Sequence, residues 1–255
     1  MALNVALYGV RPGWAMTERS RSALQRTPDH LAIGPSALSW NGDHLAIEIQ
    51  EMTFPIPSRF RGTVIVRPRA LVNRDFPLDP AGRHVWQPLA TRADVEVRMR
   101  APGLSWRGEG YFDSNFGDEP LEAGFRIWHW SRAHLKDREV VLYEGARRDG
   151  SRFALGLGFG RDGDVSEVPL PPEVALRRTL WRMPRHTRAD AGADVRIRRT
   201  WEDTPFYART ALSTRLFGET GDAVHESLSL DRLRSPVVKL MLPYRMPRVI
   251  GWGRG

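Results

Sequence analysis

Apolar and polar side chains alternate with a period of two along much of this chain, which predicts short β-strands rather than helices. In residues 45–51, Leu45, Ile47 and Ile49 share one side of the predicted strand, and polar residues occupy the other. Residues 93–100 repeat the pattern. Frequent prolines separate the alternating runs and argue against long helices. The pattern therefore predicts an all-β protein.

The same reasoning places the other expected elements. Extended segments are expected at residues 3–10, 30–33, 45–51, 62–67, 84–86, 93–100, 104–106, 111–115, 139–144, 153–159, 165–168, 176–183, 193–200, 207–217 and 227–230. The run at residues 236–242 is expected to be a short amphipathic helix, packed against the core in preference to a membrane surface.

Residues 110–135 hold the most concentrated candidate chemistry. In an extended strand, Tyr111, Asp113 and Asn115 point to one face. Trp128 and Trp130 share a face of the next expected strand in the same way. A carboxyl group beside aromatic rings suits a reaction that protonates an apolar substrate and then shelters a cation. The alternative is a hydrogen-bonded Asp with a purely structural role in a strand pair.

A second pair lies upstream, where residues 84–86 read His-Val-Trp after a turn. Period two places His84 and Trp86 on one face of a strand. Taken alone, a His after a Gly-Arg turn is more often at the surface, and a Trp is more often part of the core. The pair becomes a candidate site only in combination with Asp113.

Composition narrows the possible classes of protein. The 255 residues contain no Cys, so neither a disulfide framework nor a thiolate metal site is expected. The net charge of +8 is carried almost wholly by Arg, and no basic cluster indicates nucleic-acid binding. The apolar runs are too short for a transmembrane helix, and no signal peptide opens the chain. We expect a cytoplasmic protein whose cationic surface favours contact with anionic lipid.

Other polar groups carry weaker signals. His129 and His134 lack a third ligand at defined spacing, so no metal site is expected. The pair His225-Glu226, with Asp231 and Arg232, indicates an ion-pair cluster rather than a catalytic triad.

Several long motifs resemble the carotenoid 1,2-hydratases, also called hydroxyneurosporene synthases. They are G-Y-x-D-x-N-x-G-x-x-P-L at residues 110–121, W-x-W-S-R-A-H at 128–134, EDTPFYAR at 202–209, HESLSLDRLRSP at 225–236 and LPYRMPR at 242–248. Together they extend over most of the chain. Phe116 stands where the family usually has Trp, and the family normally has a further N-terminal segment.

The resemblance implies two tandem lipocalin-like antiparallel β-barrels or half-barrels. The expected domains are residues 1–120, incomplete at their start, and residues 121–255. A barrel without its first strands exposes an unpaired edge, so we expect poor solubility unless another element caps that edge.

The resemblance also implies an activity, which is the addition of water across the terminal C1–C2 double bond of acyclic carotenes such as neurosporene and lycopene. No cofactor or metal is required. Asp113 is the expected acid, because burial in an apolar pocket raises the pKa of a carboxyl group. Tyr111 and Trp86 are expected to face the cation, and His84 to orient the acid or accept a proton from water. Asn115, Phe116, Trp128 and Trp130 are the expected substrate-binding residues.

Two other functions remain compatible with the residues. One is a lipocalin-like carrier of a hydrophobic ligand without catalysis, and the other is a lipocalin-like cyclase or Diels–Alderase. In the hydratase interpretation the partner is an acyclic carotene, reached by peripheral contact of a cytoplasmic protein with the membrane. No nucleic-acid partner is expected.

Overall fold

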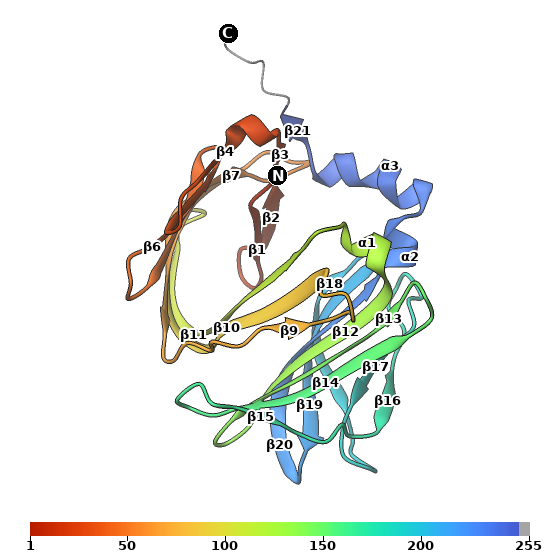
Figure 1. The fold of residues 1–255 in the computed structure, drawn as a ribbon. Coiled ribbons are helices and arrows are strands. Elements are labelled where there is room, and N and C mark those ends of the chain that lie inside the picture. The colour runs from red at the N-terminus through yellow and green to blue at the C-terminus, as the bar shows by residue number, and fades with distance from the viewer. Residues whose placement is uncertain (250–255) are drawn as a thin grey trace. The chain divides into compact units, whose positions relative to one another are not determined.

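The computed structural model describes residues 1–249, and antiparallel strands dominate them (Figure 1). The strands are β1 (Asn4–Leu7), β2 (Gly13–Met16), β3 (Glu18–Arg19), β4 (Leu24–Arg26), β5 (His30–Ile33), β6 (Ser36–Trp40), β7 (Leu45–Met52), β8 (Arg59–Pro68), β9 (Phe76–Pro77), β10 (His84–Ala101), β11 (Leu104–Gly117), β12 (Phe125–His134), β13 (Glu139–Arg147), β14 (Arg152–Phe159), β15 (Val165–Glu167), β16 (Glu173–Leu176), β17 (Arg185–Arg188), β18 (Arg196–Asp203), β19 (Tyr207–Leu216), β20 (Glu219–Ser229) and β21 (Arg248–Val249). The helices are a 3₁₀ turn at Arg21–Ala23, α1 (Leu121–Gly124), α2 (Leu230–Leu233) and α3 (Pro236–Arg245).

Two large sheets contain most of these strands. One has the order β11-β10-β8-β7-β6-β5-β4, with β9 also paired to β10, and the other has the order β15-β14-β13-β12-β20-β19-β18. Both orders have two ends, so these are open sheets and not closed barrels. The prediction of an all-β, half-barrel architecture is therefore confirmed.

By its internal packing the chain divides into two compact units that interleave in sequence. Unit 1 contains Met1–Arg69, Arg92–Tyr111 and the C-terminal segment from Lys239, and unit 2 contains Ala70–Thr91 and Phe112–Val238. Both β10 and β11 contribute one part to each unit. Compact packing units need not coincide with domains, so the domain boundary expected at residue 120 stays a prediction.

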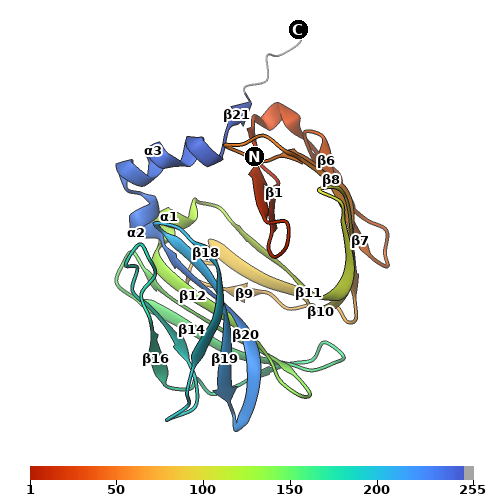
Figure 2. The same ribbon diagram turned by 180° about the vertical axis from the view of Figure 1, so that it is seen from behind.

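Unit 1 is a curved sheet with a hairpin packed onto it. The hairpin of β1 and β2 places Val5, Leu7 and Ala15 against Ile49 and Phe60 of the sheet. Figure 2 shows the hairpin beside the wall formed by β6, β7 and β8. The apolar positions of the alternating strands thus form this core, as the period-two pattern predicts.

One buried carboxylate organises the polar side of unit 1. Glu51 is 3% exposed and receives two hydrogen bonds from the Arg19 guanidinium, at 3.0 and 2.8 Å. The Ser36 hydroxyl donates a third, at 2.9 Å. These contacts tie β3, β6 and β7 together.

Unit 2 is built on the seven-stranded sheet, whose two faces differ. Leu142, Leu212 and Leu216 belong to an apolar cluster. The hairpin of β16 and β17 contacts β12 and β20 of the sheet. The candidate catalytic residues lie at the other face, described below.

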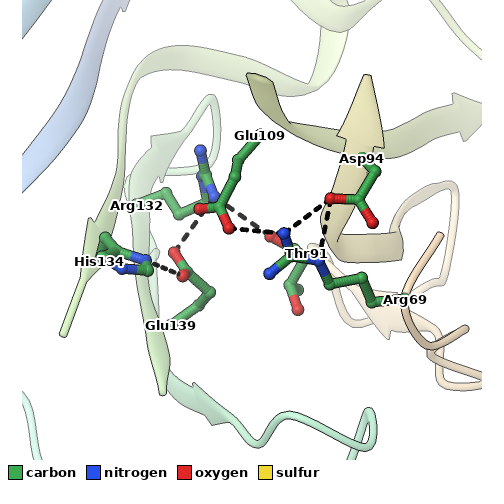
Figure 3. A network of polar contacts seen from close by, with 7 residues as sticks. All are labelled: Arg69, Thr91, Asp94, Glu109, Arg132, His134 and Glu139. Carbon is green, nitrogen blue, oxygen red and sulfur yellow. Dashed lines mark hydrogen bonds and ion pairs between the residues drawn. The ribbon is translucent and has the colours of Figure 1, made fainter. Parts of the chain in front are cut away.

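Polar networks also join strands within each unit (Figure 3). In unit 2, Glu139 is 1% exposed and accepts from Arg132 and His134, at 3.1 and 2.5 Å. Arg132 also donates to the backbone oxygen of Thr91 at 3.1 Å. In unit 1, Arg69 contacts Asp94 and Glu109 at 2.7 and 2.8 Å.

Several sequence-based expectations need correction, and the segments expected at 104–106 and 111–115 form one strand, β11. The segments expected at 84–86 and 93–100 belong to a single strand, β10, which continues through Pro88. The strand expected at 176–183 ends at Leu176, because a turn follows in which Arg182 has φ 58°. Strand β6 was not expected at all.

The helix expected at residues 236–242 exists as α3, and its Val238 is buried, at 7% exposure, but a second set of its apolar side chains is exposed. Val237, Leu240, Met241 and Tyr244 are 66, 83, 43 and 70% exposed. Their spacing of i, i+3, i+4 and i+7 places them on one side of the helix. The sequence showed the amphipathic pattern but could not show what the apolar side packs against. No helix within residues 1–249 has the length and apolar character needed to cross a bilayer.

The Glu51 network predicts a large effect of one substitution in unit 1. Glu51→Ala leaves the Arg19 guanidinium buried without its carboxylate, so the free energy of unfolding should fall by about 3–5 kcal/mol. Urea unfolding followed by circular dichroism measures this loss. Asp43→Ala is the control, because Asp43 is 78% exposed in its pair with His44 and should change stability little. Equal stability of the two variants would contradict the structural role of Glu51.

Candidate active site

The contact at the centre of the site joins Trp86 of β10 to Asp113 of β11. The indole Nε1–H of Trp86 donates a hydrogen bond to Oδ2 of Asp113, at 2.8 Å. Trp86 is 0% exposed, and Asp113 is half-buried. Strand alternation predicted that each residue belongs to a candidate pair, and the structure brings these two together in unit 2.

Aromatic rings surround the buried side of this contact. The Trp86 ring meets Tyr143 edge to face at 5.5 Å and lies 5.5 Å from Phe76. Tyr143 in turn packs against Trp128 at 5.9 Å and Phe153 at 5.4 Å. Ring faces carry partial negative charge, so such a cluster can stabilise a cation that forms beside it.

The register of the sheet sets a row of side chains next to this cluster. Trp130 of β12 is paired with Tyr143 of β13 on one side and with Glu226 of β20 on the other. Glu226 is paired with Arg209 of β19. Directly opposed residues of neighbouring strands share a face. Arg209, Glu226, Trp130 and Tyr143 therefore lie on one face of the sheet.

Trp128 lies two residues before Trp130 and contacts the same Tyr143 ring, so the prediction that the two Trp residues share a face is confirmed. Trp130 is 8% exposed, and Trp128 is half-buried. Their role in binding substrate stays a prediction.

Tyr143 and Glu226 are site residues that sequence reasoning missed. Burial, and then the charges of Asp113 and Glu226, raise the pKa of Tyr143 well above its usual value, so its hydroxyl stays neutral. Burial also raises the pKa of Glu226, against the opposing charge of Arg209 2.7 Å away, and the charge of Asp113 adds to the increase. Both residues occupy alternating strand positions, but only the register shows that they neighbour Trp130.

The sequence-based partners of Glu226 were wrong. Its ion pair is formed with Arg209 and not with Arg232, whose guanidinium donates to the backbone oxygens of Trp181 and Pro205. Asp231 pairs with Arg126 and Arg148 instead. Adjacent residues of a strand point to opposite faces, which explains why His225 and Glu226 do not act together.

His84 is buried at the start of β10, at 2% exposure, and is not at the surface. Its Nε2 lies 3.1 Å from Oε1 of Glu119, and its ring packs against Phe125 at 4.8 Å. Gly124 makes room for this arrangement, since a Cβ there would lie 2.6 Å from Nε2 of His84. The structure therefore holds His84 through Glu119, a partner that the sequence did not indicate.

The remaining predicted residues follow along β11. Tyr111 is half-buried and ends the part of the strand that belongs to unit 1. Asn115 is exposed, and Phe116 is 51% exposed. Their roles stay predictions.

On the opposite face of the sheet, three groups have the spacing of metal ligands. One ligand atom each from Glu144, Glu173 and His186 lies within 4.8 Å of the others. Arg188, however, binds both oxygens of Glu144 at 3.0 and 2.6 Å and reaches Glu173 at 3.3 Å. The guanidinium thus already occupies oxygens of both carboxyl groups that a metal ion would use.

The pKa of Glu144 in this second group is typical of a carboxylate held in a structural ion pair. Burial alone would raise the pKa of Glu144, but hydrogen bonds from His186 and Arg188 lower it to about 2. Burial lowers the pKa of His129, which lies beside His186, to about 3. His129 and His134 point to opposite faces and contact Ser227 and Glu139 respectively, so they do not form a joint site.

The fold and site together define an all-β, lipocalin-like protein in which carboxyl groups are set among aromatic rings. A solved structure assigned as an AttH from Nitrosomonas europaea has the same fold, with a TM-score of 0.59 and 12% identity over 86% of this chain and 76% of that chain. The family model described as carotenoid hydratase CrtC matches residues 1–254. The chain belongs to this carotenoid hydratase family.

Two curated relatives support the assignment to the family. The acyclic carotenoid 1,2-hydratase of Thiocapsa roseopersicina is 54% identical over 98% of this chain and 62% of its own length. The acyclic carotenoid 1,2-hydratase of Cereibacter sphaeroides is 41% identical over 98% of this chain and 90% of its own length. The chain therefore spans less than two thirds of the first relative and most of the second.

The packing around His84 predicts the effect of enlarging Gly124. Gly124→Ala places a methyl group against the His84 ring and the Glu119 carboxylate, so the pair must move and stability should fall by about 1–3 kcal/mol. Thermal unfolding measures the change. Gly108→Ala is the control, because nothing lies within 4 Å of the added Cβ. An unchanged melting temperature for Gly124→Ala would show that His84 is not held as described.

Proposed function

We propose that this chain adds water across the terminal C1–C2 double bond of an acyclic carotene, such as neurosporene or lycopene, with Asp113 as the proton donor. The observation that carries the proposal is the Trp86–Asp113 hydrogen bond at the edge of a buried aromatic cluster. Membership of the carotenoid hydratase family supports the choice of substrate.

Each residue is proposed to have a distinct role. The Trp86 N–H holds the Asp113 carboxyl group beside the aromatic cluster, where its acid form is proposed to face the alkene. The proton adds to C2, and the tertiary cation at C1 is stabilised by the rings of Trp86 and Tyr111, at about 0.5–2 kcal/mol per ring. His84, held by Glu119, orients the start of β10 and therefore Trp86. Water then attacks C1.

The chain itself offers every group that this proposal uses, so no step requires a cofactor or metal. Trp128, Trp130, Asn115 and Phe116 are proposed to line the path of the polyene. The alternative functions, a carrier or a cyclase, use the same apolar wall, but they do not need a carboxyl group aimed at the end of the ligand.

Asp113→Asn tests the assignment of the acid. Asn is nearly isosteric and still accepts the Trp86 hydrogen bond, so the fold should persist. It supplies no acidic proton, so hydration should fall by about 10²–10⁴-fold. Asp113→Glu should keep a small part of the hydration activity. Trp86→Phe and His84→Ala should each lose part of that activity. The measurement is hydroxylated product per mole of folded protein, with folding checked by circular dichroism.

The outcomes of this experiment separate the competing functions. A tertiary alcohol indicates a hydratase, unchanged ligand a carrier, and a cyclic product a cyclase. Substantial turnover by folded Asp113→Asn would remove Asp113 from the mechanism.

We further propose that the protein meets its substrate at a membrane surface, because acyclic carotenes partition into bilayers. The exposed apolar side of α3 supports this proposal. Residues 232–255 contain six basic residues and no acidic one, which favours anionic headgroups.

Flotation with anionic vesicles tests membrane contact. The chain should float at low salt and less so at high salt, because the electrostatic part of the attraction is screened. Leu240→Asp should weaken flotation by removing an apolar contact and adding a negative charge. Leu71→Asp, at a residue that is 56% exposed elsewhere on the surface, is the control. Absence of binding at low salt would contradict the proposal.

A further inference from the structure

Alkene hydration needs a group that accepts a proton as well as one that donates a proton. After Asp113 protonates C2, the water that attacks C1 must lose a proton. His84 was expected to be available for this step, but its Nε2 is engaged by Glu119. A second carboxyl group, that of Glu226, lies in the same cross-strand row as Trp130 and Tyr143.

We propose that Glu226 is the general base of the site and accepts the proton from the attacking water. This inference rests on the proposed hydratase function and goes beyond it, because the sequence indicated only an ion-pair role for Glu226.

The register gives Glu226 its position. Glu226, Trp130 and Tyr143 are successive members of one cross-strand row, so Glu226 is two strands from Tyr143, roughly 10 Å between main chains. The Tyr143 ring contacts Trp86, which binds Asp113. The charge of Asp113 acts on both Tyr143 and Glu226. The two carboxyl groups are therefore close enough to influence each other.

The environment of Glu226 suits a base. The Tyr207 hydroxyl and the Arg209 guanidinium both contact the carboxylate and keep it ionisable although it is buried. Burial nevertheless makes it more basic than an exposed Glu. A more basic carboxylate takes a proton from water more readily in the transition state.

Glu144, on the opposite face of the same sheet, can be compared with Glu226. Glu144 is also held by an Arg, but the hydrogen bonds around it strongly favour its ionised form. Glu226 is affected in the opposite direction. Groups with a catalytic task are often displaced from their ordinary acidity toward neutrality, whereas a structural ion pair favours the charged form.

The Asp113 carboxyl gives its proton to C2, and the π-electron pair forms the new C–H bond, which leaves the cation at C1. A lone pair of water forms the C1–O bond. One proton of that water moves to the Glu226 carboxylate. Transfer of a proton from Glu226 back to Asp113, through solvent or directly, restores the starting state.

Glu226→Gln tests the proposal, because Gln keeps the size and hydrogen-bonding capacity of the side chain without its basicity. The rate of hydration, kcat, should fall by about 10²–10⁴-fold in folded protein, with little change in KM. Glu144→Gln is the matched control, a buried carboxylate paired with Arg on the other face. It should lose stability but keep the kcat of the folded enzyme.

The pH profile provides a readout that a structural role would not change. In the wild-type chain, kcat/KM should rise with pH as Glu226 ionises, with a midpoint above the ordinary carboxyl range. This rise of kcat/KM on the acidic side should be absent from Glu226→Gln and present in Glu144→Gln. If Glu226→Gln does not fold, the wild-type profile still decides, because a flat rate on the acidic side would overturn the proposal.

The outcomes distinguish this inference from the proposed function. Wild-type rate or an unchanged rise of kcat/KM on the acidic side in folded Glu226→Gln, together with loss of activity in Asp113→Asn, would overturn only the role of Glu226. Absence of hydration by the wild-type chain with lycopene and neurosporene would overturn both.

Discussion

The hydrogen bond from Trp86 to Asp113 is the interaction on which the site depends. A fully buried indole N–H needs an acceptor, because leaving it unpaired costs about 1–3 kcal/mol. Asp113 supplies that acceptor, and the hydrogen bond fixes the orientation of its carboxyl group. The Trp86 ring is itself fixed by Tyr143 and Phe76. The packing of the aromatic cluster therefore also determines where the acid lies.

The seven-stranded sheet keeps two buried polar systems apart. Because side chains alternate across the sheet, Glu226 and Tyr143 lie on one face and Glu144 and His129 on the other. The first group borders the aromatic cluster, and its carboxyl group becomes more basic. In the second, Glu144 pairs with Arg188 and contacts His186, which holds β13 to β17. One scaffold therefore provides both a reactive and a structural environment for carboxyl groups.

Much of the local structure could be predicted from the sequence, because strand period and burial follow directly from side-chain type. Residues 30–33 form β5 as expected, and Val97 and Met99 point inward. Trp86 and Asp113 could be selected because each lies in a same-face pair and Asp113 also lies within a long motif.

The features that could not be predicted depend on contacts between residues that are far apart in the sequence. Glu119 as the partner of His84, and Arg209 as the partner of Glu226, are set by strand register and chain path. The continuity of β10 through Pro88 and the exposed side of α3 likewise depend on neighbours far apart in the sequence. Local alternation carries no information about these partners.

Hydration in D₂O tests most directly whether a proton is delivered to carbon C2, as the assignment of Asp113 as the acid requires. The product is isolated after many turnovers, its hydroxyl is exchanged back in H₂O, and the remaining deuterium is located by NMR. Proton transfer from Asp113 to the alkene predicts one carbon-bound deuterium at C2 for each hydroxyl group at C1. A hydroxylated product without deuterium at C2, or with deuterium elsewhere in the polyene, would contradict this mechanism.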